Sequence, residues 1–98
     1  MEHKFKKRPV SPGEILSEEF LKPMKLTQKD FSEHIGVDIK VVNRLVNERT
    51  SVNPELAVKL SLALGPSPQF WLNAQMAMDL WKLEEERFEI KRIKIKTA

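Results

Sequence analysis

The stretch LTQKDFSEHIGVDIKVVNRLVNERT, residues 26–50, decides the fold. Apolar residues recur in it every three or four positions, as they do on one face of a helix, yet Gly36 interrupts the pattern near its middle. Glycine inside a helix costs about 1 kcal/mol relative to alanine, so one continuous helix would gain nothing from it. The pattern instead predicts two short helices joined by a turn, in which Gly36 adopts the left-handed conformation.

Capping residues mark where these two helices begin. Thr27 is an N-cap with Asp30 three residues later, and Asp38 caps the second helix. Two short helices joined by a three-residue turn with glycine form a helix-turn-helix unit, whose second helix can enter the DNA major groove. The residues expected to pack the two helices together are Phe31, Ile35, Val37, Val42 and Leu45, with the small Ser32 at the crossing.

The outer face of the second helix favours DNA over a hairpin that serves packing alone, which the spacing leaves open as an alternative. Once Val42 and Leu45 point inward, the residues expected to point outward are Lys40, Val41, Asn43, Arg44 and Asn47. Lysine and arginine suit guanine, and asparagine suits adenine. No glutamate lies between residues 38 and 47, although a solvated helix face commonly carries some.

Three further helix starts share one pattern, a polar cap followed by proline at the first helical position. The caps are Ser11, Asn53 and Ser67. The second of these helices is apolar on most sides and is expected to be the most buried element. The sequence therefore predicts an all-α domain of five helices, the three additional ones spanning residues 12–21, 54–64 and 68–87.

The last helix carries more apolar surface than one core needs. One stripe of its side chains can cover the domain's own core, and the other calls for a partner, because tryptophan and methionine are enriched at interfaces. Burial of both stripes within one chain remains the alternative. A C2 homodimer is predicted, since it would place two recognition helices on a palindromic site. The expected interface residues are Trp71, Met76, Met78, Leu80 and Trp81.

Composition and charge divide the chain into a domain with two basic ends. Its 98 residues suit a single domain. Residues 1–8 and 88–98 each carry four bases and one acid, so we divide the chain into an N-terminal arm (1–10), a DNA-binding and dimerisation domain (11–87) and an Ile/Lys tail (88–98). Basic ends fit a polyanion or an acidic protein surface as partner, and two solvated tails that aid solubility fit equally well. The tail alternates with a strand period but changes phase after Ile90, so a bulged strand, an edge strand and disorder all stay open.

Other functional classes find little support in the sequence. There is no cysteine, and no apolar run is long enough to span a membrane. The basic start lacks the apolar middle of a signal peptide, so a cytoplasmic location is expected. The two histidines, His3 and His34, lie in no catalytic pattern, and the three glycines form no phosphate-binding loop. We expect no enzyme activity, cofactor, metal or small-molecule substrate.

Two blocks outside the opening stretch carry a resemblance to a known family. PGEIL with EEFL (residues 12–16 and 18–21) and SPQFWLN with DLW (67–73 and 79–81) resemble the HigA antitoxins, also called virulence-associated protein I. These belong to the phage-repressor-like (XRE) helix-turn-helix proteins, and the resemblance covers residues 9–82. It implies a lambda-repressor-like fold and a homodimer that represses its own operon at a palindromic operator on double-stranded DNA. It also implies a partner toxin, a HigB-like mRNA endonuclease of the RelE type; a stand-alone repressor without a toxin is the alternative.

The resemblance also implies roles for single residues. Gln28 and Thr27, with Asn47 and Arg49, would contact DNA phosphates and fix the register. This sequence departs from the common family pattern at residues 38–40, where small hydroxyl residues or arginine are frequent. An acid there faces a polyanion unless it caps the helix. The residues that would read bases are Ile39, Lys40, Asn43 and Arg44.

Overall fold

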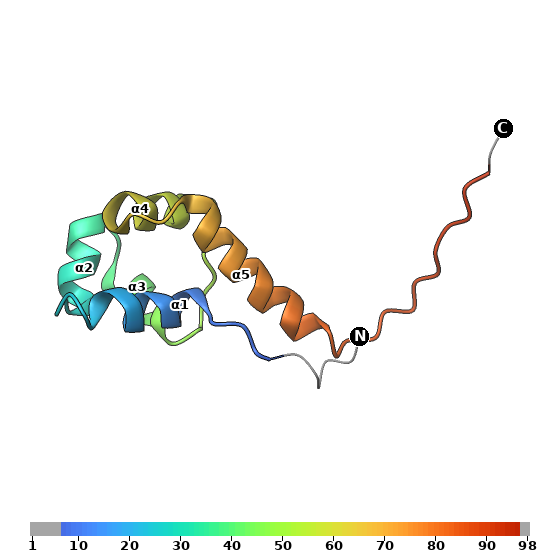
Figure 1. Ribbon diagram of the computed structural model, residues 1–98, viewed down its shortest axis with the longest axis horizontal. Coiled ribbons are helices and arrows are strands. Elements are labelled where there is room, and N and C mark those ends of the chain that lie inside the picture. The colour runs from blue at the N-terminus through green and yellow to red at the C-terminus, as the bar shows by residue number, and fades with distance from the viewer. Residues whose placement is uncertain (1–6, 97–98) are drawn as a thin grey trace.

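The computed structural model describes residues 7–96, and every regular element in that range is helical. The chain turns back on itself several times, so that α4 lies across one side of the body while α1 and α3 lie on the other (Figure 1). Helix α5 runs obliquely between these two sides. The elements are α1 (Pro12–Ile15), η2 (Leu16–Leu21), α2 (Gln28–Ile35), α3 (Ile39–Val46), α4 (Pro54–Leu64) and α5 (Pro68–Leu83).

Every predicted cap is found at the start of its helix. The cap side chain accepts a hydrogen bond from a backbone N–H in the first turn, which has no partner within the helix itself. The five-helix, all-α architecture predicted from the sequence is confirmed, with α1 and η2 forming one continuous helical stretch. The pairs are Ser11 with Glu14, Thr27 with Asp30, Asp38 with Lys40, Asn53 with Leu56, and Ser67 with Phe70.

The first helical stretch has the predicted extent but an unexpected geometry. After Ile15 its backbone hydrogen bonds join residues five apart, which is the π-helix pattern. One example is the bond from Lys22 N to Ser17 O, which is 3.0 Å long. Because this pattern brings residues five apart onto one side, Leu16 and Leu21 are both buried. On its exposed side, a hydrogen bond from Lys22 holds the pKa of Glu18 below its ordinary value.

Trp71 of α5 is the largest side chain in the core and is fully buried. Phe70 meets it edge-on at 5.3 Å between ring centroids, and Phe20 of η2 lies 5.9 Å away. It belongs to a core cluster that draws residues from every helix, including Phe31 of α2 and Leu60 of α4. One core therefore joins the helix-turn-helix unit to the elements on both sides of it.

Two expectations about helices α4 and α5 are wrong. Helix α4 buries Leu56 and Leu60 but leaves Leu62 83% exposed, so it is not the most buried element. The main contacts of α4 are with α5 and α2, and the side of α4 that carries Leu62 lies away from them. Helix α5 ends at Leu83 rather than at residue 87.

The predicted dimer interface needs correction at Trp71 and Met78. Both are buried inside the single chain, 0% and 2% exposed, so neither can contact a second copy. The inward face of α5 runs through residues 71, 74 and 78. Met76 and Leu80 are more than half exposed, and Trp81 is partly buried.

The two ends of the described chain leave the helical body near the end of α5 (Figure 1). Arg8 of the N-terminal arm pairs with Glu48 and lies 3.8 Å from Glu14, so the arm is fixed to the domain at this point. Residues 86–96, here called the C-terminal tail, run away from the body and form no strand within the described chain. The remaining parts of the predicted arm and tail, 1–6 and 97–98, lie outside the described residues. No helix in the described range is long and apolar enough to cross a membrane.

Candidate nucleic-acid interface

The turn at Gly36 sets the two helices of the unit against each other. Gly36 has φ of +72° and ends α2, as predicted. Phe31 and Ser32 of α2 are buried against Val42 and Leu45 of α3, each at most 3% exposed. The predicted packing of the unit is confirmed, and it fixes which face of α3 remains outside.

The exposed face of α3 gathers the side chains predicted to read bases. Lys40, Asn43 and Arg44 are exposed, and Ile39 is 44% exposed beside them. Val41, expected to point outward, instead packs partly against the core. The exposed set lines a hollow of about 260 Å³ together with Gln28 from the start of α2.

Gln28 and Asn43 are directly joined across the two helices. Asn43 Nδ2 donates a hydrogen bond to Gln28 Oε1, 3.1 Å long. Asn43 thereby keeps its side-chain oxygen as an acceptor and one N–H as a donor. These two groups complement the N6–H donor and the N7 acceptor that adenine presents in the major groove. The amide nitrogen of Gln28 remains available to a phosphate. The sequence analysis assigned Gln28 to phosphate and Asn43 to bases and did not predict this hydrogen bond, because a separation of fifteen residues gives no sign of contact.

Asp38 is committed to capping, which removes the conflict that its charge raises beside DNA. Its Oδ1 accepts a hydrogen bond from Lys40 N at 2.8 Å. The carboxylate therefore lies at the N-terminus of α3, where the helix dipole favours negative charge. Lys40 and Arg44 supply the positive charge of the exposed face.

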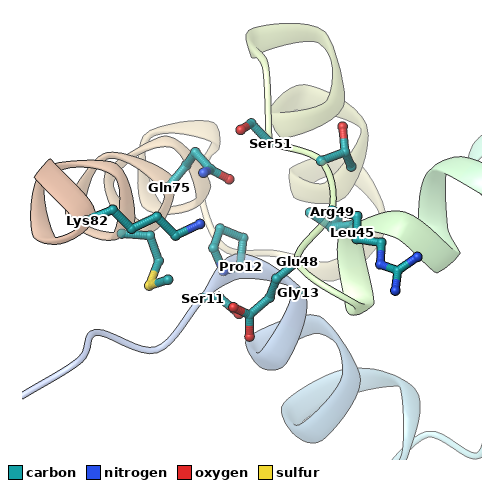
Figure 2. Close-up of a pocket in the computed structure, with 11 residues that line it drawn as sticks. Ser11, Pro12, Gly13, Leu45, Glu48, Arg49, Ser51, Gln75 and Lys82 are labelled. Atoms are coloured by element: carbon teal, nitrogen blue, oxygen red, sulfur yellow. The ribbon is translucent and has the colours of Figure 1, made fainter.

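The residues assigned to phosphates lie at the start of α2 and just after α3, and they differ in how far their side chains are already hydrogen-bonded. Thr27 Oγ1 caps α2, and the amide of Asn47 donates to the carbonyl oxygen of Asn43 at 2.9 Å. Arg49 is exposed in the loop that follows α3. Its side chain points away from Gln75 and Lys82 (Figure 2). Arg49 is the charged member of this set, and its side chain is exposed to solvent.

The loop that carries Arg49 is fixed by contacts that the sequence did not reveal. Val52 N donates to Gln75 Oε1 of α5 at 2.9 Å, and Glu48 adopts the left-handed conformation with φ of +58° while it pairs with Arg8. Between the loop, α1 and α5 lies a recess of about 230 Å³ (Figure 2). The loop is therefore held on both sides by contacts within the chain itself.

The described residues contain no cluster of metal-binding side chains. No group of three or more His, Asp or Glu side chains there could hold a metal ion. His34, at the end of α2, is exposed, and His3 lies outside the described residues. The chemistry of the site is thus hydrogen bonding and charge, directed outward from α3.

A helix-turn-helix unit with a polar, basic recognition face defines a class of DNA-binding protein, and comparison with known proteins agrees. Residues 18–71 match the helix-turn-helix family. The chain is 50% identical to antitoxin HigA-1 of Vibrio cholerae over 78 residues, 80% of this chain and 73% of that protein. It is 39% identical to a helix-turn-helix transcriptional regulator of Haemophilus influenzae over 94% of this chain and 87% of that protein.

Among solved structures, antitoxin GraA in complex with its operator is similar at 36% identity. The TM-score is 0.81, and the match covers 91% of this chain and 95% of GraA. The chain belongs to the HigA-type antitoxins of the helix-turn-helix family. It is a DNA-binding antitoxin or regulator and not an enzyme.

Proposed function

We propose that this protein is the antitoxin of a type II toxin-antitoxin module, which represses its own operon as a homodimer and neutralises a RelE-like mRNA endonuclease. The observation that carries the proposal is the 50% identity to antitoxin HigA-1 over four-fifths of the chain. The exposed face of α3 supports the DNA-binding half of the function.

On DNA, α3 would lie in the major groove with its hollow over base edges. Asn43, held by Gln28, matches adenine, while Lys40 and Arg44 match guanine. Ile39 offers an apolar surface to a thymine methyl group. Arg49 and the amide of Gln28 would hold the flanking phosphates, fixing the position of the helix.

The homodimer would form through the exposed ridge of α5. Met76, Leu80 and Leu83 follow one another at helical spacing and are 55%, 58% and 48% exposed. The partly buried Trp81 lies one residue beyond Leu80. A C2 dimer that forms through this ridge would contain two copies of α3. Both could bind a palindromic operator whose half-sites are about 34–36 Å apart.

A stand-alone repressor is the second candidate function, favoured by the likeness to a transcriptional regulator over nearly the whole chain. Both candidates require DNA binding and differ only in the toxin. Expression of the chain together with the product of the adjacent gene separates them. Copurification, with loss of that product's ribosome-dependent mRNA cleavage, supports the antitoxin, whereas an adjacent product that neither binds nor cleaves leaves the repressor.

The DNA-binding half is tested by a mobility-shift assay on the protein's own upstream region. Arg44→Glu should abolish the sequence-specific shift, because it places a negative charge against the groove. Lys59→Glu, on α4 and outside the hollow, changes the net charge by the same amount and should still shift. An Arg44→Glu variant that binds like the original chain would show that α3 is not the recognition helix.

A further inference from the structure

Gln75 of α5 reaches across to the loop between α3 and α4, residues 47–53. Its Oε1 accepts a hydrogen bond from Val52 N at 2.9 Å. Val52 is 5% exposed, so its backbone N–H needs a partner within the protein. Gln75 also lines the recess between this loop and α5 (Figure 2). The end of the loop next to α4 is thus fixed by a residue that lies 23 positions further along the chain.

Asp79, one helical turn beyond Gln75, determines which way the Gln75 amide faces. Gln75 Nε2 donates a hydrogen bond to Asp79 Oδ1 at 2.9 Å. A carboxylate only accepts, so the amide nitrogen turns to Asp79 and the amide oxygen turns to Val52 N. The opposite orientation would set two acceptors together at one end and two donors at the other. The three groups therefore form one chain of hydrogen bonds from Asp79 through Gln75 to the loop.

The other end of the loop is fixed where α3 stops. Arg49 N donates to Arg44 O at 2.7 Å. Glu48 N donates to Leu45 O at 3.1 Å, and the two bonds together close α3 as a Schellman motif. Glu48 takes the left-handed conformation that glycine usually supplies at this position, with φ of +58°. Arg49 thus leaves the end of α3 in a defined direction.

We propose that Gln75, oriented by Asp79, is a positioning residue for DNA binding and holds the loop so that Arg49 meets a phosphate of the operator. The proposal rests on the phosphate contact of Arg49 in the proposed function and names the residues that prepare it. Val52 is three residues beyond Arg49, at most about 10 Å along the chain, so movement of Val52 away from α5 shifts the backbone that carries Arg49. The Arg49 side chain points away from Gln75 (Figure 2), so α5 acts on it through the backbone and not by direct contact.

Gln75→Ala removes the link and leaves Arg49 in place. It should weaken binding of the full chain to the operator and to unrelated DNA by the same factor, roughly three- to tenfold, which is what one hydrogen bond contributes. The ratio of the two affinities should not change, because the bases are read by α3. Circular dichroism gives the folded fraction in the assay buffer, and the affinities are compared per folded chain. Unchanged affinity of a folded Gln75→Ala chain would overturn the proposal.

A double-mutant cycle shows whether Gln75 acts through Arg49. In an Arg49→Ala chain, Gln75→Ala should weaken binding by less than about twofold, because the contact that it prepares is already gone. Arg44→Ala is the matched control, since it removes a cation from α3 and leaves the loop intact. In that background Gln75→Ala should keep its full effect. Equal losses in both backgrounds would mean that Gln75 supports the fold as a whole, and would refute the positioning role.

An exchange of polar groups tests the part played by Asp79. Gln75→Glu alone keeps an acceptor for Val52 N but sets two carboxylates against each other, so affinity should fall. Adding Asp79→Asn supplies an amide that donates to the new carboxylate, and it returns the net charge to that of the original chain. Affinity should then recover to within about twofold of the original. A double variant that stays as weak as Gln75→Glu would contradict the chain of hydrogen bonds.

Asn73→Asp is the control for charge in this exchange. It adds the same negative charge to α5 and keeps the oxygen that accepts from Gln69. Binding by Asn73→Asp should therefore stay within about twofold of the original, since an exposed charge outside the contact has little effect. A loss equal to that of Gln75→Glu would assign the effect to charge alone and contradict the orienting role of Asp79.

Two reference measurements separate failure of this inference from failure of the proposed function. An unaltered chain that gives no sequence-specific shift would overturn the proposed function. A normal shift, combined with an Arg49→Ala chain that binds as tightly as the original, would remove the phosphate contact on which the positioning depends. The inference would then fall, while base reading by α3 would stand.

Discussion

Gly13 of α1 lies directly against the main chain of Leu45 in α3. A Cβ atom placed on Gly13 would stand 1.8 Å from the carbonyl oxygen of Leu45 and 2.6 Å from its carbonyl carbon. Backbone cannot move aside as a flexible side chain can, so α1 would have to separate from the recognition helix. We expect Gly13→Ala to lower the free energy of unfolding by about 3 kcal/mol, measured by urea denaturation. A loss below 1 kcal/mol, on the order of a surface substitution, would contradict this close approach.

Gly36→Ala should be milder, because its cost is conformational alone. The residue has φ of +72°, yet an added Cβ would meet no atom within 4 Å. The left-handed conformation costs an ordinary residue about 1–2 kcal/mol, which is the expected loss in the same denaturation experiment. Gly36→Asn should cost less than Gly36→Ala, since asparagine tolerates this conformation. Equal losses for the two variants would argue against the left-handed turn.

The hydrogen bond between Gln28 and Asn43 predicts coupled effects on DNA binding. Asn43→Ala should weaken operator binding by about 1–3 kcal/mol and relax the preference for adenine at one position. Gln28→Ala should release the Asn43 amide, so the double variant should lose less than the sum of the two single losses, by at least about 0.5 kcal/mol. Binding to the operator and to versions with single A·T replacements measures both effects. Strict additivity would mean that Gln28 contacts phosphate without positioning Asn43.

Arg49 and Arg44 should respond differently to salt and sequence. Arg49→Ala removes a proposed phosphate contact, so it should weaken all DNA equally and reduce the slope of log K against log salt by about 1. Arg44→Ala should chiefly reduce discrimination between the operator and unrelated DNA. Titrations of both variants at several salt concentrations measure the two quantities. An Arg49→Ala variant with an unchanged slope would remove Arg49 from the phosphate contacts.

The exposed ridge of α5 predicts the effect of a buried charge at the proposed dimer contact. Leu80 is 58% exposed, and Leu80→Glu should lower the mass observed by analytical ultracentrifugation to that of one chain. Leu62→Glu, on α4, is the matched control, because Leu62 is 83% exposed and outside the ridge. A monomeric Leu62→Glu with a dimeric Leu80→Glu would move the interface to α4.

Local chemistry explains which parts of the fold could be read from the sequence. A cap such as Thr27 acts on a backbone N–H three residues away, and Gly36 acts on its own backbone angles. Such effects span less than two helical turns, so a short stretch of sequence contains all the participants. The two helices of the recognition unit were therefore predictable, as was the exposed face of α3.

Features that depend on distant neighbours were not predictable in the same way. The tight approach of Gly13 to Leu45, the bond from Gln28 to Asn43 and the anchoring of Arg8 on Glu48 each join residues far apart in the chain. For the same reason, the apolar surface of α5 gave two stripes and no means of deciding which faced inward.

The sequence by itself thus determined the helices, their caps, the turn at Gly36 and the set of residues on the recognition face, because these follow from contacts within one or two helical turns. Only the tertiary structure decided that Trp71 and Met78 belong to the core rather than to an interface. Amphipathic periodicity reports that a helix has an apolar side, whereas the packing of neighbouring helices selects which apolar residues are covered.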